Sequence, residues 1–188
     1  MVVRTGLNVN GAETRLALNT AMPDTAPEIR AIVADPSTHM AGLVTVMLHS
    51  LKIRAVEQVA DLPRLEALLA RRPYDLLLID EQLGGEAGFA MIRTLRHTAG
   101  HPNRLLAIIM MAATPDARMI AAARDAGVNE FLRKPFSAQH IGLRLEHIRK
   151  APREFVETDI YAGPDRRRRV EVAGQPKRRA VDTPKSRA

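Results

Sequence analysis

The sequence predicts an α/β fold in which five parallel strands form one doubly wound sheet with helices on both faces. Short aliphatic runs alternate five times with helical stripes, and such alternation is typical of parallel strands joined by right-handed crossovers. The composition, 46% apolar and 26% charged, is that of an ordinary globular protein. The absence of cysteine excludes disulfides, iron–sulfur clusters and cysteine-based zinc sites.

The first two strand–helix units precede Pro73. A strand is predicted at 29–34, and Ser37 or Thr38 caps the helix that follows. A second strand is predicted at 55–59, before a short helix that stops ahead of the proline. The apolar stripes of these helices are Met40, Leu43, Val44, Met47 and Leu51 in the first, and Leu62, Leu65 and Leu69 in the second.

Three further units complete the sheet. The continuous aliphatic runs 76–79 and 105–111 are typical of buried parallel strands, and a fifth strand is predicted at 128–132. An alanine-rich helix at 116–126 ends at a glycine. The other two helices carry the stripes Phe89, Ile92 and Leu95, and Ile141, Leu145 and Ile148, the latter helix being capped by Ser137.

The flanks differ from this central domain, 29–150. Residues 1–28 show no sustained period, so we expect a flexible N-terminal arm. Residues 151–188 predict a basic, disordered C-terminal tail, because 160–188 carry nine Arg and Lys against three acidic residues. An alternative is that aromatic and aliphatic side chains of the tail pin it back on the domain, namely Phe155, Ile160 and Tyr161.

The tail contains two basic clusters, 166–169 and 177–179. They could bind nucleic-acid phosphates, anionic lipid or an acidic protein surface. The longest apolar run, 105–113, is about half of what a bilayer span needs, and no secretion signal is evident at the N-terminus. We therefore expect a cytoplasmic protein with no membrane span.

Charged residues follow three of the predicted strands. Asp35 follows the first strand, Asp80 the third and Lys134 the fifth, and ligands of such sheets bind at the carboxyl ends of the strands. Two converging carboxylates favour a hard cation such as Mg²⁺. A carboxylate beside Mg²⁺ and a lysine is a plausible nucleophile that forms an acyl phosphate.

The spacing of these three residues and the amino acids around them are similar to a known family pattern. Ile-Val-Ala-Asp35, Leu-Leu-Ile-Asp80, a glycine eight residues later at Gly88, and Lys134-Pro135-Phe136 resemble a response-regulator receiver domain of two-component signalling, of the CheY-like kind. The resemblance implies a flavodoxin-like (βα)5 fold with strand order 2-1-3-4-5.

The resemblance also implies roles for the residues. Asp80 would be the phosphoacceptor, and Asp35, Asp80 and the backbone carbonyl of Gln82 would hold Mg²⁺. Lys134 would contact the phosphoryl group, and Phe131 would be the switch aromatic. The Lys134–Pro135 bond is expected to be cis, as in relatives.

The sequence departs from the family pattern at four positions. Ala34 replaces a second acidic residue, and Ala112 replaces the Ser or Thr that usually bonds the phosphoryl group. Thr114 substitutes for that hydroxyl only if its loop shifts. Gly84 and Ala87 stand where Pro and Asp are common.

We therefore expect a stand-alone response regulator rather than an enzyme. Its partners would be a histidine kinase or phosphotransfer protein and a downstream protein. One alternative is a pseudo-receiver scaffold that works without phosphorylation, which Ala34 and Ala112 motivate. The other is a regulator that binds nucleic acid through its basic tail.

Overall fold

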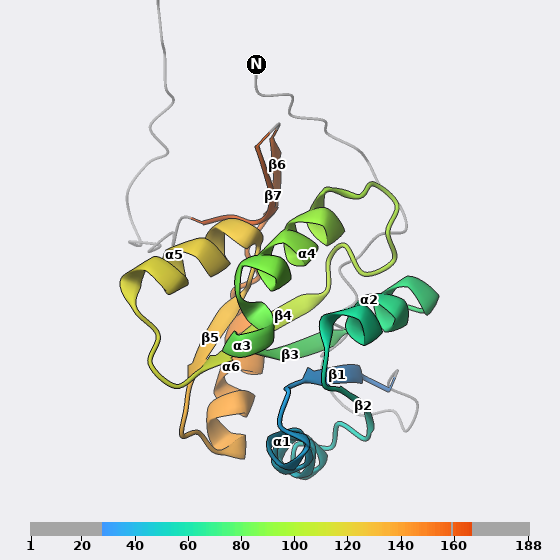
Figure 1. The fold of residues 1–188 in the computed structure, drawn as a ribbon, viewed down its shortest axis with the longest axis vertical. Coiled ribbons are helices and arrows are strands. Elements are labelled where there is room, and N and C mark those ends of the chain that lie inside the picture. Colours follow the sequence, from blue (N-terminus) through green and yellow to red (C-terminus); the bar gives the residue numbers. More distant parts are fainter. Residues whose placement is uncertain (1–27, 159, 167–188) are drawn as a thin grey trace, which may run out of the picture.

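In the computed structural model, which describes residues 28–158 and 160–166, five parallel strands form one sheet in the order β2-β1-β3-β4-β5 (Figure 1). The fold class and strand order expected from the sequence are confirmed. The strands are β1 (Arg30–Ala34), β2 (Ala55–Val59), β3 (Leu76–Asp80), β4 (Ala107–Ala112) and β5 (Glu130–Arg133). The helices are α1 (Thr38–Ser50), α2 (Leu62–Arg71), α3 (Glu81–Gly84), α4 (Glu86–His97), α5 (Ala117–Ala126) and α6 (Ala138–Lys150).

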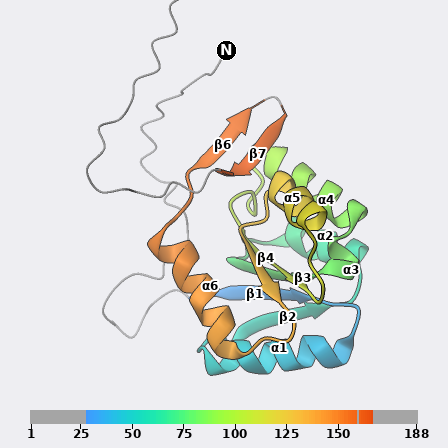
Figure 2. The ribbon, with the colours of Figure 1, turned by 90° about the vertical axis from the view of Figure 1, so that its left-hand side faces the viewer.

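Helices cover both faces of the sheet, with α1 and α6 on one face and α2, α4 and α5 on the other (Figure 2). Because side chains alternate along a strand, each central strand contributes to both cores. Ile32 and Leu77 belong to the core under α2 and α4, and their neighbours Val33 and Leu78 belong to the core under α1 and α6. Strands buried on both faces explain the continuous aliphatic runs.

The buried stripe of α1 differs from the expected one. Its fully buried residues are Ala41, Val44 and Leu48, whereas Leu43 is 42% exposed. Apolar side chains lie on nearly all sides of this helix. The spacing of its apolar residues therefore does not indicate which side faces the core. Ser37 caps it as expected, since its side chain accepts a hydrogen bond from the Met40 amide.

The domain continues past residue 150. β6 (Phe155–Thr158) and β7 (Tyr161–Pro164) form an antiparallel hairpin, and β7 packs against α4 and α5 (Figure 2). Tyr161 is buried and its hydroxyl donates to the Pro164 carbonyl, 2.5 Å away. The expected boundary at 150 is therefore too early, and the expectation of disorder is wrong for this hairpin. The alternative expectation was that Phe155, Ile160 and Tyr161 pack this segment onto the domain. Tyr161 is buried, whereas Ile160 is 88% exposed.

Glycines let the hairpin approach the body of the domain. A Cβ on Gly163 would lie 3.0 Å from the Cα of Gly127, and a Cβ on Gly127 would lie 3.0 Å from the side chain of Arg96. The buried Arg96 guanidinium donates to the backbone carbonyls of Gly127 and Leu106, at 3.0 and 2.7 Å. Desolvation by burial lowers its pKa to about 10.

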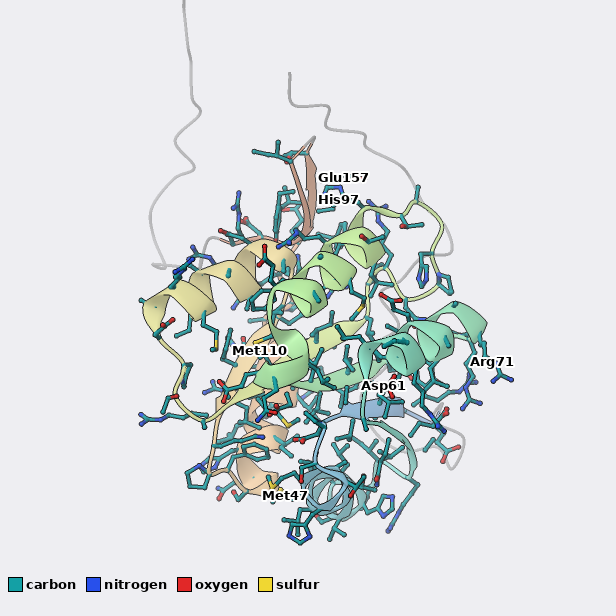
Figure 3. All side chains as sticks on the ribbon, viewed as in Figure 1. Met47, Asp61, Arg71, His97, Met110 and Glu157 are labelled. Carbon is teal, nitrogen blue, oxygen red and sulfur yellow. The ribbon has the colours of Figure 1, made fainter. Side chains whose placement is uncertain are left out.

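Polar contacts at the other strand of the hairpin add to this packing. Arg104 pairs with Glu157 at 2.5 Å, and its guanidinium lies 5.0 Å from the centre of the Phe155 ring. Glu157 of β6 lies near His97, the last residue of α4, and both are labelled in Figure 3. The arm, 1–27, and the tail clusters beyond residue 166 lie outside the described residues, so the expectations for them stay predictions. None of the helices in the described part of the chain combines the length and apolar character that a bilayer crossing requires.

The hairpin contributes to the stability of the domain. We expect Tyr161→Ala to lower the free energy of unfolding by about 2–4 kcal/mol, because it removes a buried aromatic side chain. The control Ile160→Ala removes an exposed apolar side chain from the same hairpin and should change it by less than about 0.5 kcal/mol. Urea denaturation measures both. Equal midpoints for the two variants would show that the hairpin is dispensable for folding.

Candidate functional site at the carboxyl edge of the sheet

Three ionic side chains from distant parts of the chain meet at one edge of the sheet. Asp35 follows β1, Asp80 ends the adjacent strand β3, and Lys134 follows β5. The Lys134 Nζ lies 2.5 Å from Asp80 Oδ2 and 3.4 Å from Asp35 Oδ2. The structure therefore brings together the three residues that sequence reasoning placed in one pocket.

The backbone orients both carboxylates. Asp35 Oδ1 accepts a hydrogen bond from the Ser37 amide, and Asp80 Oδ1 accepts one from the Gln82 amide, both at 2.9 Å. Each aspartate is 2% exposed. With one oxygen fixed by an amide, each carboxylate turns its other oxygen toward Lys134.

Lys134 is positioned by its own backbone. Its amide donates to the Ala112 carbonyl at 2.7 Å, and the Lys134–Pro135 bond is cis, as expected. Partial burial acts to lower the pKa of the lysine. One hydrogen bond to each of Asp80 and Asp35, and the charges of these two carboxylates, together raise the pKa above its ordinary value. The ammonium is thus held charged against two carboxylates.

The donor set fits a hard divalent cation. The Oδ2 atoms of Asp35 and Asp80 both approach a single nitrogen, so they lie within reach of one ion, and Mg²⁺ is commonly held by one or two carboxylates and water. This pair has no third His, Cys, Asp or Glu side chain beside it: within the described ranges, no group of three or more such residues is placed to hold a metal. Gln82 lies in α3, and its carbonyl as a ligand stays a prediction.

A glutamate that sequence reasoning missed lies beside the site. Glu81 Oε1 accepts a hydrogen bond from the Ala113 amide at 2.9 Å, which links the segment after β3 to the segment after β4. Ala112 is fully buried, and Thr114 is exposed and makes no hydrogen bond to any described residue. The only sequence signal for Glu81 was its position directly after Asp80.

Phe131 occupies β5 opposite Met110 of β4. It is partly buried and packs against the core under α2, α4 and α5. Its role as a switch aromatic stays a prediction.

The glycines after Asp80 allow close packing. A Cβ on Gly84 would overlap the terminal methyl of Met110, which Figure 3 labels beside α3. A Cβ on Gly88 would overlap the backbone carbonyl of Leu83. Together these contacts hold α3 and the start of α4 close to the site.

The fold and this acidic, lysine-containing edge define a class of signalling domain. A comparison with protein families matches residues 31–146 to the response regulator receiver domain. The match covers more than half of the chain. The chain belongs to the response regulator receiver family.

Individual proteins are similar in sequence to this chain over most of their own length. The chemotaxis protein CheY of Pseudomonas aeruginosa is 25% identical over 120 residues, which are 64% of this chain and 95% of that protein. CheY-3 of Vibrio cholerae is 23% identical over 120 residues, 64% of this chain and 91% of that protein.

Solved structures show the same fold. The chemotaxis response regulator CheY4 of Vibrio cholerae has a TM-score of 0.56 at 18% identity, over 64% of this chain and 98% of that one. The response regulator DrrB of Thermotoga maritima has a TM-score of 0.54 at 14% identity, over 70% of this chain but only 57% of DrrB. DrrB therefore supports the fold of the shared part alone.

The raised pKa of Lys134 predicts how the site contributes to stability. Because the pKa of Lys134 is raised in the folded state, its charge stabilises the fold fully at pH values below the ordinary lysine pKa of 10.5. This stabilisation is lost as pH rises through the folded-state pKa. The difference in unfolding free energy between wild type and Lys134→Met should stay constant from neutral pH to about pH 9 and shrink above the ordinary lysine pKa.

Urea denaturation at a series of pH values checks this expectation. Lys150→Met, at a lysine that is 64% exposed, is the control and should show only a small difference. A Lys134→Met difference that already falls between neutral pH and about pH 9 contradicts the raised pKa.

Gly88 offers a second test. Gly88→Ala should destabilise the domain by about 1–3 kcal/mol, because the added methyl group meets a backbone carbonyl. Gly42→Ala is the matched control in α1, where nothing lies within 4 Å of the added Cβ, and it should stabilise by about 0.5–1 kcal/mol. Thermal denaturation compares them. If both variants changed the stability in the same direction, the inferred close packing at Gly88 would be wrong.

Proposed function

We propose that the chain is a response regulator that accepts a phosphoryl group on Asp80, with Mg²⁺, and signals through contacts with another protein. The observation that carries the proposal is the Lys134 ammonium, which lies within 3.4 Å of both buried carboxylates. Family membership supports it at the level of two-component signalling. The phosphodonor would be a histidine kinase or phosphotransfer protein.

The transfer is a substitution at phosphorus. A carboxylate oxygen of Asp80 forms the new O–P bond, the N–P bond of a phosphohistidine breaks, and the histidine nitrogen leaves with the electron pair and regains a proton. Such transfer depends mainly on positioning and charge, and the amide of Gln82 fixes the Asp80 carboxylate. Lys134 would contact a phosphoryl oxygen on Asp80.

Asp35 and Asp80 would hold the cation, with Gln82 as a further ligand. When bound, Mg²⁺ would offset the negative charge of the phosphoryl oxygens. The proposal includes a signalling role rather than an enzymatic one, and a cytoplasmic location, with which the absence of cysteine from the sequence is compatible.

A second candidate is a scaffold that does not depend on phosphorylation. It is favoured by buried Ala112 at the end of β4, where the family pattern has a hydroxyl, and by buried Ala34 in place of a second acid. In that case Lys134 would serve as a permanent structural link between the two aspartates. Thr114 would then contact no phosphoryl group.

A small phosphodonor with Mg²⁺ separates these candidates. Wild type should gain the mass of one phosphoryl group, and Asp80→Asn should gain none. Asp35→Asn should need more Mg²⁺ for the same labelling. The matched control is Asp75→Asn, because Asp75 accepts a hydrogen bond from the Arg30 amide at the opposite edge of the sheet and should not affect labelling.

Labelling that persists in Asp80→Asn would reject the phosphoacceptor. If wild type takes no label, and beryllofluoride with Mg²⁺ leaves its amide resonances unmoved, the scaffold candidate holds and the phosphorylation proposal fails.

A further inference from the structure

A groove of about 470 Å³ lies between the C-terminal end of α1 and α6, next to the start of β1. Figure 2 shows α1 and α6 on the same face of the sheet. The two elements approach closely here, since a Cβ on Gly142 of α6 would lie 3.4 Å from the side chain of Leu51, which ends α1. We refer to this feature as the α1–α6 groove.

The lining of the α1–α6 groove is mainly apolar. Ile53 and Leu145 belong to the core under α1 and α6, and Ile29 and Leu51 are partly buried against the same core. Leu143 also lines the groove and is 54% exposed. The groove therefore presents apolar surface that a further apolar group could cover.

Charge contributes little to this surface. Among the described residues that line the groove, Glu146 and Arg149 are charged, and their charges are opposite. The Glu146 carboxylate also pairs with Lys150 at 2.5 Å. A nucleic-acid backbone or a strongly charged peptide would find no excess of either sign here. The lining favours an occupant with large apolar side chains.

The N-terminal segment of the chain joins the domain at this groove. Ile29 lines the groove, and residues 1–27 precede the first described residue, Glu28. A segment that is covalently attached beside a binding surface has an effective concentration on the order of millimolar. It therefore competes well against a separate protein of the same chemistry that is present at lower concentration.

The N-terminal segment carries suitable side chains. Residues 16–22 read Leu-Ala-Leu-Asn-Thr-Ala-Met, in which Leu16, Leu18 and Met22 are large and apolar. Met22 precedes Ile29 by seven residues, which span at most about 25 Å when they are extended. The apolar stretch is thus attached close enough to reach the groove.

We propose that residues 16–22 dock in the α1–α6 groove of the same chain, with their large apolar side chains packed against Leu51 and Leu143. The docked segment would tie α1 to α6, the two helices that follow Asp35 and Lys134 of the candidate site. The inference goes beyond the proposed function and does not depend on phosphorylation.

Limited trypsin digestion of the full chain tests the proposal. Trypsin cuts after Arg15, directly before the docking segment, and after Arg4 farther upstream. A docked segment must leave the groove before the protease can extend it, so cleavage after Arg15 reports the undocked fraction. Leu143→Ser should speed cleavage after Arg15 at least about fivefold and leave cleavage after Arg4 unchanged. Mass spectrometry of the fragments measures both rates.

A second variant cannot disturb the folded domain. Leu18→Ser/Met22→Ser lies outside the described residues and should speed cleavage after Arg15 as Leu143→Ser does. The matched control is Ile120→Ser, because Ile120 is 42% exposed on α5, which covers the other face of the sheet. This control should digest as wild type does. All variants should keep the circular dichroism spectrum of wild type.

Introduced cysteines identify the surface that the segment contacts, because the chain has no cysteine of its own. With oxidised glutathione, Thr20→Cys/Gln139→Cys should form a disulfide within one chain, since Gln139 lines the groove and is exposed. The matched pair is Thr20→Cys/Arg118→Cys, with Arg118 exposed on α5. It should form the disulfide at least about tenfold more slowly. Non-reducing gels and intact mass distinguish a disulfide within one chain from one between two chains.

Three outcomes would overturn the proposal. The first is equal cleavage after Arg15 in wild type, Leu143→Ser and Leu18→Ser/Met22→Ser. The second is an equal rate of disulfide formation in the two cysteine pairs, which would mean that the segment has no preferred surface. The third is a disulfide chiefly between two chains, which would assign the groove to a second copy. Loss of Asp80 labelling with intact protection of Arg15 would instead reject the phosphorylation proposal alone.

Discussion

The contact of one ammonium with two buried carboxylates governs the carboxyl edge of the sheet. Asp35 and Asp80 lie at the carboxyl ends of the neighbouring strands β1 and β3 and are each 2% exposed, and the repulsion between two such charges is costly unless a cation compensates it. Lys134 supplies that cation from β5, which is separated from β3 by β4. The strand order β2-β1-β3-β4-β5 is thus a condition for the site, because it sets which strand ends lie within reach of one another.

The opposite end of the sheet is organised by a different cation. The buried Arg96 guanidinium binds backbone carbonyls of Gly127 and Leu106, which ties α4 to the segments around β4 and β5. The hairpin then packs over this region through Tyr161 and Gly163. A domain limited to the family match would lack this covering, so the β6–β7 hairpin is a structural part of this receiver.

The alternation of strands and helices could be predicted from the amino acids alone, because aliphatic runs such as 76–79 and glycine or serine boundaries are local signals. The same local signals indicated the three ionic residues, because parallel strands end at one edge of a sheet. Packing in the folded chain was needed to select the inward face of α1, where apolar side chains surround the helix, and to form the link from Glu81 to Ala113. The docking of the hairpin also depends on packing, because a buried tyrosine and two close glycines act through contacts with residues far away in the sequence.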